Sequence, residues 1–259
     1  MAANFLTITP VHHLHLSFGN SIIYNQHTAK LQYCIPVLFY KAVDDVYNAT
    51  DNHNGENAQM FLDISCRSLK HVHVYTTLYI DEIGISRMFD KNKQSNYLSW
   101  KIGGSLLNFP LPNLVLSAEY TRCNPHCYQH FYQTTDFTSS GVNMGSYLGD
   151  NAQEFFMQAS YRPLSRLQLT ASLTRSEKGT PLVYGQGEPW GIPFMAETVF
   201  THTRMTFKAD YELLNNVHVF AELHHYKNAG ETQYITTYAP LFFSGNSGNT
   251  LAGGLAIGF

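Results

Sequence analysis

The sequence predicts an all-β fold built from antiparallel strands, and three observations predict it. Apolar and polar residues alternate with a period of two along most of the chain, no segment shows a sustained helical period, and short polar turns alternate with long loops. Charged residues make up 14% of the 259 residues and aromatic residues another 14%. A chain with so few charges and so many aromatic residues has enough apolar surface to fold, so disorder is excluded.

About eleven strands are predicted from this alternation. Residues two apart on a strand share one face, so each segment has an apolar face and a polar face. The clearest alternating segments are 14–18, 60–65, 72–80, 98–106, 114–121, 167–174, 205–212, 217–224 and 251–259.

The last of these segments carries a second signal. Leu251, Leu255, Ile257 and Phe259 fall on one face, and small residues fall on the other. A terminal strand of this pattern ending in Phe resembles the assembly signal of bacterial outer-membrane β-barrels. The alternative is an ordinary C-terminal edge strand with one face of small residues.

The connections fall into two sizes that alternate along the chain. Short periplasmic turns with long extracellular loops are typical of an outer-membrane barrel, so the sequence predicts an antiparallel transmembrane β-barrel of about 11–12 strands. The alternative is a soluble lipocalin-like or sandwich protein. The expected short turns are 10–13, 68–71, 110–113, 162–165 and 214–216, and the expected long loops are 25–57, 83–96, 122–152, 175–200 and 226–249.

A barrel wall in a membrane faces hydrocarbon on one side and a watery lumen on the other. We therefore expect charged residues on the lumenal face and aromatic residues in interfacial girdles near the strand ends. The expected lumenal residues are Lys101, Glu119, Lys208, Asp210 and Glu222; the expected girdle residues are Tyr97, Trp100, Tyr120, Tyr161, Tyr211 and Phe259.

Two features of the sequence do not fit a complete barrel formed by this chain alone. Single-chain bacterial barrels have an even number of strands, and the first ten residues lack the cationic and apolar regions of a signal peptide. We expect residues 1–259 to form a single barrel domain, the C-terminal part of a longer precursor that carries further strands and the signal. Closure of the barrel by this chain alone is left open.

Several ordered segments resemble the Wzi-type capsule assembly proteins, in the form found in Bacteroidetes. No single segment is diagnostic, but their order and spacing resemble the C-terminal half of that family over nearly the whole chain. The segments are 5–7 (FLT), 20–24 (NSIIY), 33–40 (YCIPVLFY), 78–82 (LYIDE), 113–122 (NLVLSAEYTR), 124–130 (NPHCYQH), 145–152 (GSYLGDNA) and 161–163 (YRP).

The resemblance implies a non-enzymatic protein of the cell outer membrane that acts in capsule assembly as a surface lectin. Its implied partners are capsular or surface polysaccharide, outer-membrane lipid and, during biogenesis, the barrel assembly machinery. Some relatives, the RemB-like proteins, are linked instead to gliding motility. A barrel enzyme acting on lipid or glycan, or a porin for small solutes, is the further alternative.

Two loops carry the residue types that sugar recognition uses. Aromatic faces stack on the apolar faces of a pyranose, while charged and amide groups satisfy its hydroxyls. The alternative is that aromatic loops simply pack over the barrel mouth. The candidate glycan-binding residues are Glu119, Arg122, His126, Tyr128, His130, Tyr132, Tyr184 and Trp190.

Other chemistry finds less support in the sequence. His71 and His73 could share a metal on one strand face, but no closely spaced third ligand or HExxH motif follows, so no metal or cofactor is expected. Cys123 and Cys127 are four residues apart, and both a local disulfide and free thiols are left open. A net charge of -3 excludes a nucleic-acid binder, which would carry a basic patch.

Enzyme signatures are also missing. The chain has no GxSxG, Walker or GxGxxG motif. The acidic pairs Asp44–Asp45 and Asp81–Glu82 could serve acid–base chemistry, but no nucleophile or base partner can be named. No catalytic residue is therefore expected.

Overall fold

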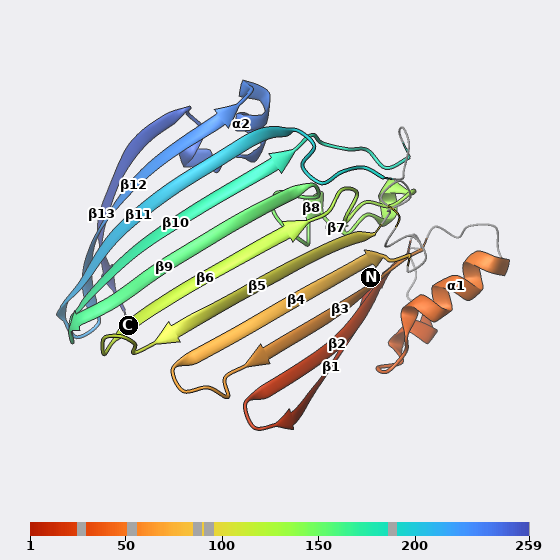
Figure 1. Cartoon of the computed structure of the whole chain (residues 1–259), viewed down its shortest axis with the longest axis horizontal. Helices are drawn as coiled ribbons and strands as arrows, with labels where there is room; N and C mark the ends of the chain where they lie inside the picture. Colours follow the sequence, from red (N-terminus) through yellow and green to blue (C-terminus); the bar gives the residue numbers. More distant parts are fainter. Residues whose placement is uncertain (25–29, 51–55, 85–89, 91–95, 186–190, 259) are drawn as a thin grey trace.

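The structure, a computed structural model, describes residues 1–24, 30–50, 56–84, 90, 96–185 and 191–258. In this part of the chain eleven strands form one antiparallel sheet in which every strand pairs with its neighbour in sequence, apart from a short hairpin between β6 and β9 (Figure 1). The strands are β1 (Ala2–Val11), β2 (Leu14–Ile23), β3 (Asn57–Cys66), β4 (Val72–Glu82), β5 (Tyr97–Leu107), β6 (Leu114–Cys123), β9 (Ala152–Leu164), β10 (Leu167–Gly179), β11 (Thr198–Leu214), β12 (Val217–Gly230) and β13 (Ser247–Ile257). The predicted all-β fold and its strand number are confirmed.

The sheet has two edges, β1 and β13. Within the described residues these strands do not pair with each other, so the eleven strands form an open, curved wall (Figure 1). A membrane-spanning sheet must satisfy every backbone donor and acceptor, which an edge in lipid cannot do. The sheet therefore has the fold of a barrel wall, and its two edge strands, β1 and β13, are unpaired in the described chain.

The register separates the two faces of the wall. One row of paired residues runs Leu116–Ala159–Ala171–Phe207–Leu223–Leu251 across six strands. Its large side chains are uncovered, with Phe207 57% and Leu251 77% exposed. An apolar face left bare across a whole sheet is what hydrocarbon solvates, so this outer face is the lipid face.

The opposite, inner face is polar. Lys208 pairs with Glu222 across β11 and β12, and Lys101 pairs with Thr121 across β5 and β6. The prediction that the charged residues share the lumenal face is confirmed by this register. Strand alternation suffices to sort them, because the side-chain period is two.

At one end of the wall the strands are joined by tight turns, as predicted. A left-handed backbone is needed in these turns, and His and Asn adopt it more readily than most side chains. His13 and His71 have φ values of 66°, Asn113 of 60° and Asn216 of 64°. Two of the chain's histidines, His13 and His71, thus serve turn geometry.

At the other end lie the long loops, and here the predicted boundaries need correction. β10 continues to Gly179 and β12 to Gly230, because polar residues keep pairing beyond the last apolar one. The loops also contain short helices and a small hairpin that strand alternation did not predict. These elements are η1 (Leu31–Cys34), α1 (Tyr40–Thr50), η3 (Gln133–Thr135), the hairpin β7 (Thr138–Ser139) and β8 (Val142–Asn143), α2 (Thr232–Tyr238) and η4 (Leu241–Phe243).

No helix in the described part of the chain is long and apolar enough to cross a membrane. Of the expected girdle residues, Tyr161 and Tyr211 lie on the outer face near the tight-turn end, and Trp100 contacts Tyr120 with ring centroids 5.2 Å apart. The prediction was wrong for Tyr97, which is not in a girdle. It is buried beneath a long loop, where it packs against His126. Phe259 lies outside the described residues.

Candidate functional site

The loop between β6 and β9, residues 124–151, folds back onto the inner face of the wall. Tyr128 and Phe137 from this loop pack against Tyr79 of β4, with ring centroids 4.9 and 5.0 Å from the Tyr79 ring. Phe61 of β3 packs against the same cluster. The loop therefore plugs the inner face at the long-loop end; we call residues 124–151 the plug loop.

Carboxylates at fixed positions hold the plug loop by its backbone. Asp81 of β4 accepts a hydrogen bond from the Tyr128 N–H at 2.8 Å. Asp150 accepts one from the His126 N–H, also at 2.8 Å, and its other oxygen lies 3.0 Å from Nζ of Lys178 on β10. These bonds explain why a polar loop with little regular structure keeps one conformation.

The loop after β12 adds a second layer to the plug. Ile235 of α2 packs with Leu148 of the plug loop and with Phe200, which points inward from β11. Lys178 lies 5.7 Å from the ring centroid of Tyr238, so the same cation faces both loops. The two long loops thus form one packed unit over the inner face.

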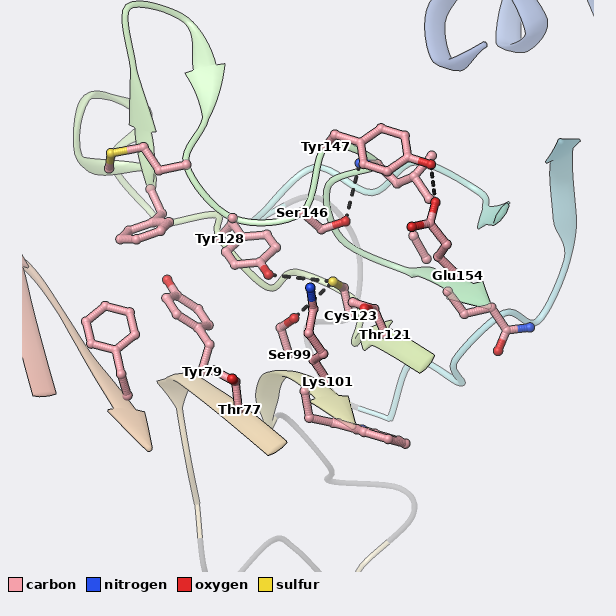
Figure 2. Close-up of a pocket in the computed structure, with 18 residues that line it drawn as sticks. Thr77, Tyr79, Ser99, Lys101, Thr121, Cys123, Tyr128, Ser146, Tyr147 and Glu154 are labelled. Atoms are coloured by element: carbon pink, nitrogen blue, oxygen red, sulfur yellow. Dashed lines mark hydrogen bonds between the residues drawn. The ribbon is translucent and has the colours of Figure 1, made fainter. Parts of the chain in front are cut away.

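A cavity of about 560 Å³ lies between the plug loop and the strands. Its floor is the inner face of β3 to β6 and the start of β9, and its roof is residues 144–148 of the plug loop (Figure 2). Aromatic and polar side chains line it together, which is the composition expected of a small-molecule site. The main lining residues are Phe61, Thr77, Tyr79, Ser99, Lys101, Thr121, Cys123, Tyr128, Phe137, Met144, Ser146, Tyr147 and Glu154.

The polar side of the cavity lies along one cross-strand row, of which Thr77, Lys101, Thr121 and Glu154 line the cavity itself. Asp63, Thr77, Lys101, Thr121, Glu154 and Ser176 pair in that order across the sheet. Neighbouring strands lie about 4.8 Å apart, so the row presents a hydrogen-bonding group at each such step.

Glu154 is the acceptor at one end of the cavity. Its carboxylate receives a hydrogen bond from the Tyr147 hydroxyl (Figure 2). The Ser176 hydroxyl donates a second one at 2.7 Å. Burial, followed by the hydrogen bond to Glu154, raises the pKa of Tyr147, so the phenol keeps its proton and donates.

Lys101 is the cation among the described residues that line the cavity. Its Nζ lies 2.9 Å from Oε1 of Glu119, and Oε2 of Glu119 accepts a hydrogen bond from Tyr75 at 2.6 Å. Lys101 therefore lines the cavity while its ammonium group is paired with the Glu119 carboxylate.

One polar atom of the cavity wall has no partner. Tyr79 is 7% exposed, and its hydroxyl oxygen makes no hydrogen bond within the described residues. A buried hydroxyl without a partner is costly, so a bound molecule or water that pairs with it would be favoured here.

The structure disperses the predicted glycan-binding residues. Only Tyr128 lines the cavity, while Glu119 reaches it through Lys101. Arg122 projects from the outer face, where its guanidinium lies 3.7 Å from the Phe194 ring centroid. Trp190 lies outside the described residues.

The other four candidates are parts of the loops' own packing. His126 is 3% exposed between Tyr97 and Tyr184, with ring centroids 5.6 and 5.7 Å away. His130 accepts or donates a hydrogen bond at 2.8 Å to Thr135, and burial lowers its pKa to about 4. Tyr132 is partly exposed beside it.

Sequence reasoning missed the residues that line the cavity most closely, Tyr147 and Glu154 among them. Lys101 and Glu119 were assigned to the lumenal face, but their pairing depends on the register of β5 and β6. The four members of the row that line the cavity come from four strands, β4, β5, β6 and β9. The row could have been predicted by aligning the strands in register. The hydrophobic pattern and the tight turns together fix which residues of neighbouring strands are partners.

The remaining candidates have structural partners. His71 Nδ1 contacts the Leu107 carbonyl oxygen at 2.7 Å, and His73 Nε2 contacts Ser65 Oγ at 2.9 Å. In the described part of the chain no three His, Cys, Asp or Glu side chains gather as a metal site would require. Lys41 lies 3.1 Å from Asp44 and 3.3 Å from Asp45.

Cys123, at the end of β6, and Cys127, in the plug loop, are both free thiols. Cys127 is fully buried, and burial raises the pKa of its thiol. Cys123 lies 3.0 Å from Ser99 Oγ. Buried thiols of this kind behave as small apolar groups.

Comparison with known proteins gives the family. A sequence model described as "Capsule assembly protein Wzi" matches residues 1–228. The chain belongs to this family. No curated protein matches it at a significant level.

One solved structure shares the fold of this Wzi family member. The Salmonella typhi OmpF complex with daunomycin is similar with a TM-score of 0.51 and 11% identity, over 97% of this chain and 60% of that one. OmpT, an outer membrane protein of Vibrio cholerae, has a TM-score of 0.39 and 8% identity over 86% of this chain and 53% of that one. The chain thus spans about 60% of the OmpF chain. Family membership and the barrel fold with its bare apolar face assign the protein to the cell outer membrane.

Proposed function

We propose that this Wzi family protein serves capsule assembly by holding a surface polysaccharide, without cleaving it, at the cavity beneath the plug loop. The observation that carries the proposal is this cavity, in which aromatic side chains and a row of hydrogen-bonding groups face one another. Sugar rings have apolar faces and polar edges, so they need both kinds of contact.

The dimensions of the cavity support the proposal. A volume of about 560 Å³ lies within the range of about 300–1,000 Å³ that small-molecule sites occupy. Its position at the long-loop end is also favourable, because long loops of outer-membrane barrels face the cell exterior. A chain leaving the cell could therefore enter it from outside.

The non-enzymatic part of the proposal rests on the surroundings of the carboxylates. Glu154 accepts hydrogen bonds from two hydroxyls, and Glu119 pairs with Lys101. Each carboxylate is therefore held by neighbouring side chains, as suits binding.

The decisive experiment is deletion of the gene in the source bacterium and complementation with the full chain. We expect the deletion strain to release capsular polysaccharide into the medium, and the complemented strain to retain it on the cell. Chain length of the polysaccharide should be unchanged, whereas an enzyme would shorten or modify it. Unaltered retention together with slower gliding would reject the proposal in favour of a motility role.

A further inference from the structure

The charges around the cavity bear on which polysaccharides it can take. Resting on the proposed function, we infer that the cavity beneath the plug loop selects neutral or amino-sugar units and rejects uronic acids and other anionic sugars. The reason is that its exposed acceptor is an ionised carboxylate and its cation is already neutralised.

The first step concerns Glu154. Its carboxylate lines the cavity and is held in place by Tyr147 and Ser176, both of which are neutral donors. No ion pair joins Glu154 to a cation in the part of the chain that the structure describes. The negative charge of Glu154 therefore faces the cavity without a directly bonded cation, and the nearby charge of Arg204 acts on its hydrogen-bond donor Tyr147.

The second step concerns Lys101, the cation among the described lining residues. Its Nζ lies 2.9 Å from the Glu119 carboxylate, and Tyr75 fixes that carboxylate from the other side. An anionic sugar would have to displace Glu119 to gain Lys101. That exchange offers no net gain, because one carboxylate replaces another.

Two further cations of the inner face, Lys178 and Arg204, also contact groups outside the cavity. Lys178 is 2% exposed and paired with Asp150 above the cavity. The Arg204 guanidinium lies 5.2 Å from the Phe243 ring centroid, and Arg204 does not line the cavity. Asp63, which accepts a hydrogen bond from Thr77 at 2.8 Å, adds a further negative charge to the same row.

The third step concerns the neutral contacts that remain. Tyr79 offers a buried hydroxyl without a partner, and Thr121 and Ser146 line the cavity with further hydroxyls. These hydroxyl groups can form hydrogen bonds with the hydroxyls of a sugar whether the sugar is neutral or charged. A protonated amino group would gain an ion pair with Glu154, whereas a uronate would meet like charge, which is a standard means of excluding a wrong ligand.

The test uses hexamers of β-1,4-linked glucose, glucosamine and glucuronic acid, which share a backbone and differ in charge. Binding to the full chain, purified in detergent, is measured by isothermal titration at low ionic strength, where charge effects are strongest. We expect the glucosamine hexamer to bind most tightly, and the glucuronic acid hexamer to bind at least about tenfold more weakly than the glucose hexamer.

The variant Glu154→Gln separates charge from shape, since the amide oxygen can still accept from Tyr147 and Ser176. It should reduce the discrimination between the glucose and glucuronic acid hexamers to about threefold or less. Glu222→Gln is the matched control, because Glu222 lies on the same inner face but outside the cavity, 3.3 Å from His224. That control should leave the discrimination unchanged.

Tighter binding of the glucuronic acid hexamer to the wild-type chain would overturn the inference while leaving the proposed function intact. Failure of all three hexamers to bind would also overturn it. The proposed function is decided separately, by retention of the native polysaccharide on cells, so the two failures remain distinguishable.

Discussion

Lys178 and Asp150 form an ion pair, 3.0 Å from Nζ to Oδ1, in which both side chains are almost completely buried. Lys178 comes from β10, in the membrane wall, and Asp150 from the plug loop. The same Asp150 also accepts a hydrogen bond from the His126 backbone. One pair therefore joins the wall to the segment that roofs the cavity.

Replacing Lys178 with Met leaves Asp150 buried without its cation. Breaking a buried pair in this way costs about 3–5 kcal/mol, so docking of the plug loop should weaken by that order. Limited proteolysis in detergent measures this at residues 138–141, the exposed tip of the plug loop. Cleavage should accelerate strongly in the variant.

The control for this variant is Lys208→Met. Lys208 also lies on the inner face, 5.2 Å from the Phe220 ring centroid, but outside the plug. Its replacement should leave cleavage at the tip unchanged. Equal cleavage of both variants and the wild type would contradict the anchoring role of Lys178.

Acid should loosen the plug loop through His130. Burial, together with the charge of Lys41, lowers the pKa of His130 to about 4, below the value of about 6.5 for a free imidazole. The undocked loop therefore binds the proton more readily, and docking stability should fall as the pH drops from about 6.5 toward 4.

Hydrogen exchange of residues 130–137 at pH 7 and pH 5, corrected for intrinsic exchange rates, checks this. Burial raises the pKa of Asp136, which by the same linkage opposes the effect of His130. His130→Gln isolates the histidine and should remove most of the acid-induced loosening. An equal acid response in wild type and variant would rule out His130 as its source.

The four cysteines should differ in reactivity as their positions differ. Cys34 is exposed in the first long loop, whereas Cys123 and Cys127 are buried under the plug. A membrane-impermeant maleimide applied to intact cells should label Cys34 rapidly and the two buried thiols only after denaturation.

Mass spectrometry of tryptic fragments measures the extent of labelling at each cysteine, and the Cys34→Ser variant serves as the background control. Cys66 ends β3 at the tight-turn end, so it should react only after the outer membrane is opened. Rapid labelling of Cys127 on intact cells would mean that the plug loop does not lie against the wall.

The assignment of the two faces is tested within one strand. Leu173, at the middle of β10, lies on the outer face, and Ser172 lies on the inner face. An arginine facing lipid at the midplane costs about 2–4 kcal/mol, whereas one facing the lumen costs far less. Leu173→Arg should therefore lower the stability of the folded sheet in lipid vesicles much more than Ser172→Arg does, as measured by urea titration of the heat-dependent gel mobility. Equal losses would contradict the lipid face.

The sequence predicted the wall well because its determinants are local. Period-two alternation identified the strands, and the tight turns were found because Asn, His and Pro mark them. The lumenal position of Lys101 and Lys208 followed from the same alternation, since one face of each strand is apolar.

The site could not be predicted to the same degree. Loop composition pointed to His126, His130 and Tyr132, but their aromatic and polar groups are used in packing the loops. Glu154 and Lys101 meet only because β5, β6 and β9 pair in a particular register, with the plug loop folded over them. Such contacts between distant segments are set by tertiary structure and leave no local pattern.

The most direct test of the central claim is binding of the native capsular polysaccharide to purified protein whose cavity has been filled. Thr121 lines the cavity from β6, whereas Thr170 lies on the inner face of β10 beside Lys208, nearer the tight turns. Thr121→Trp should weaken binding at least about tenfold, or about 1.4 kcal/mol, and Thr170→Trp should leave it unchanged. Wild-type affinity in a folded Thr121→Trp variant would contradict the assignment of the cavity as the polysaccharide site.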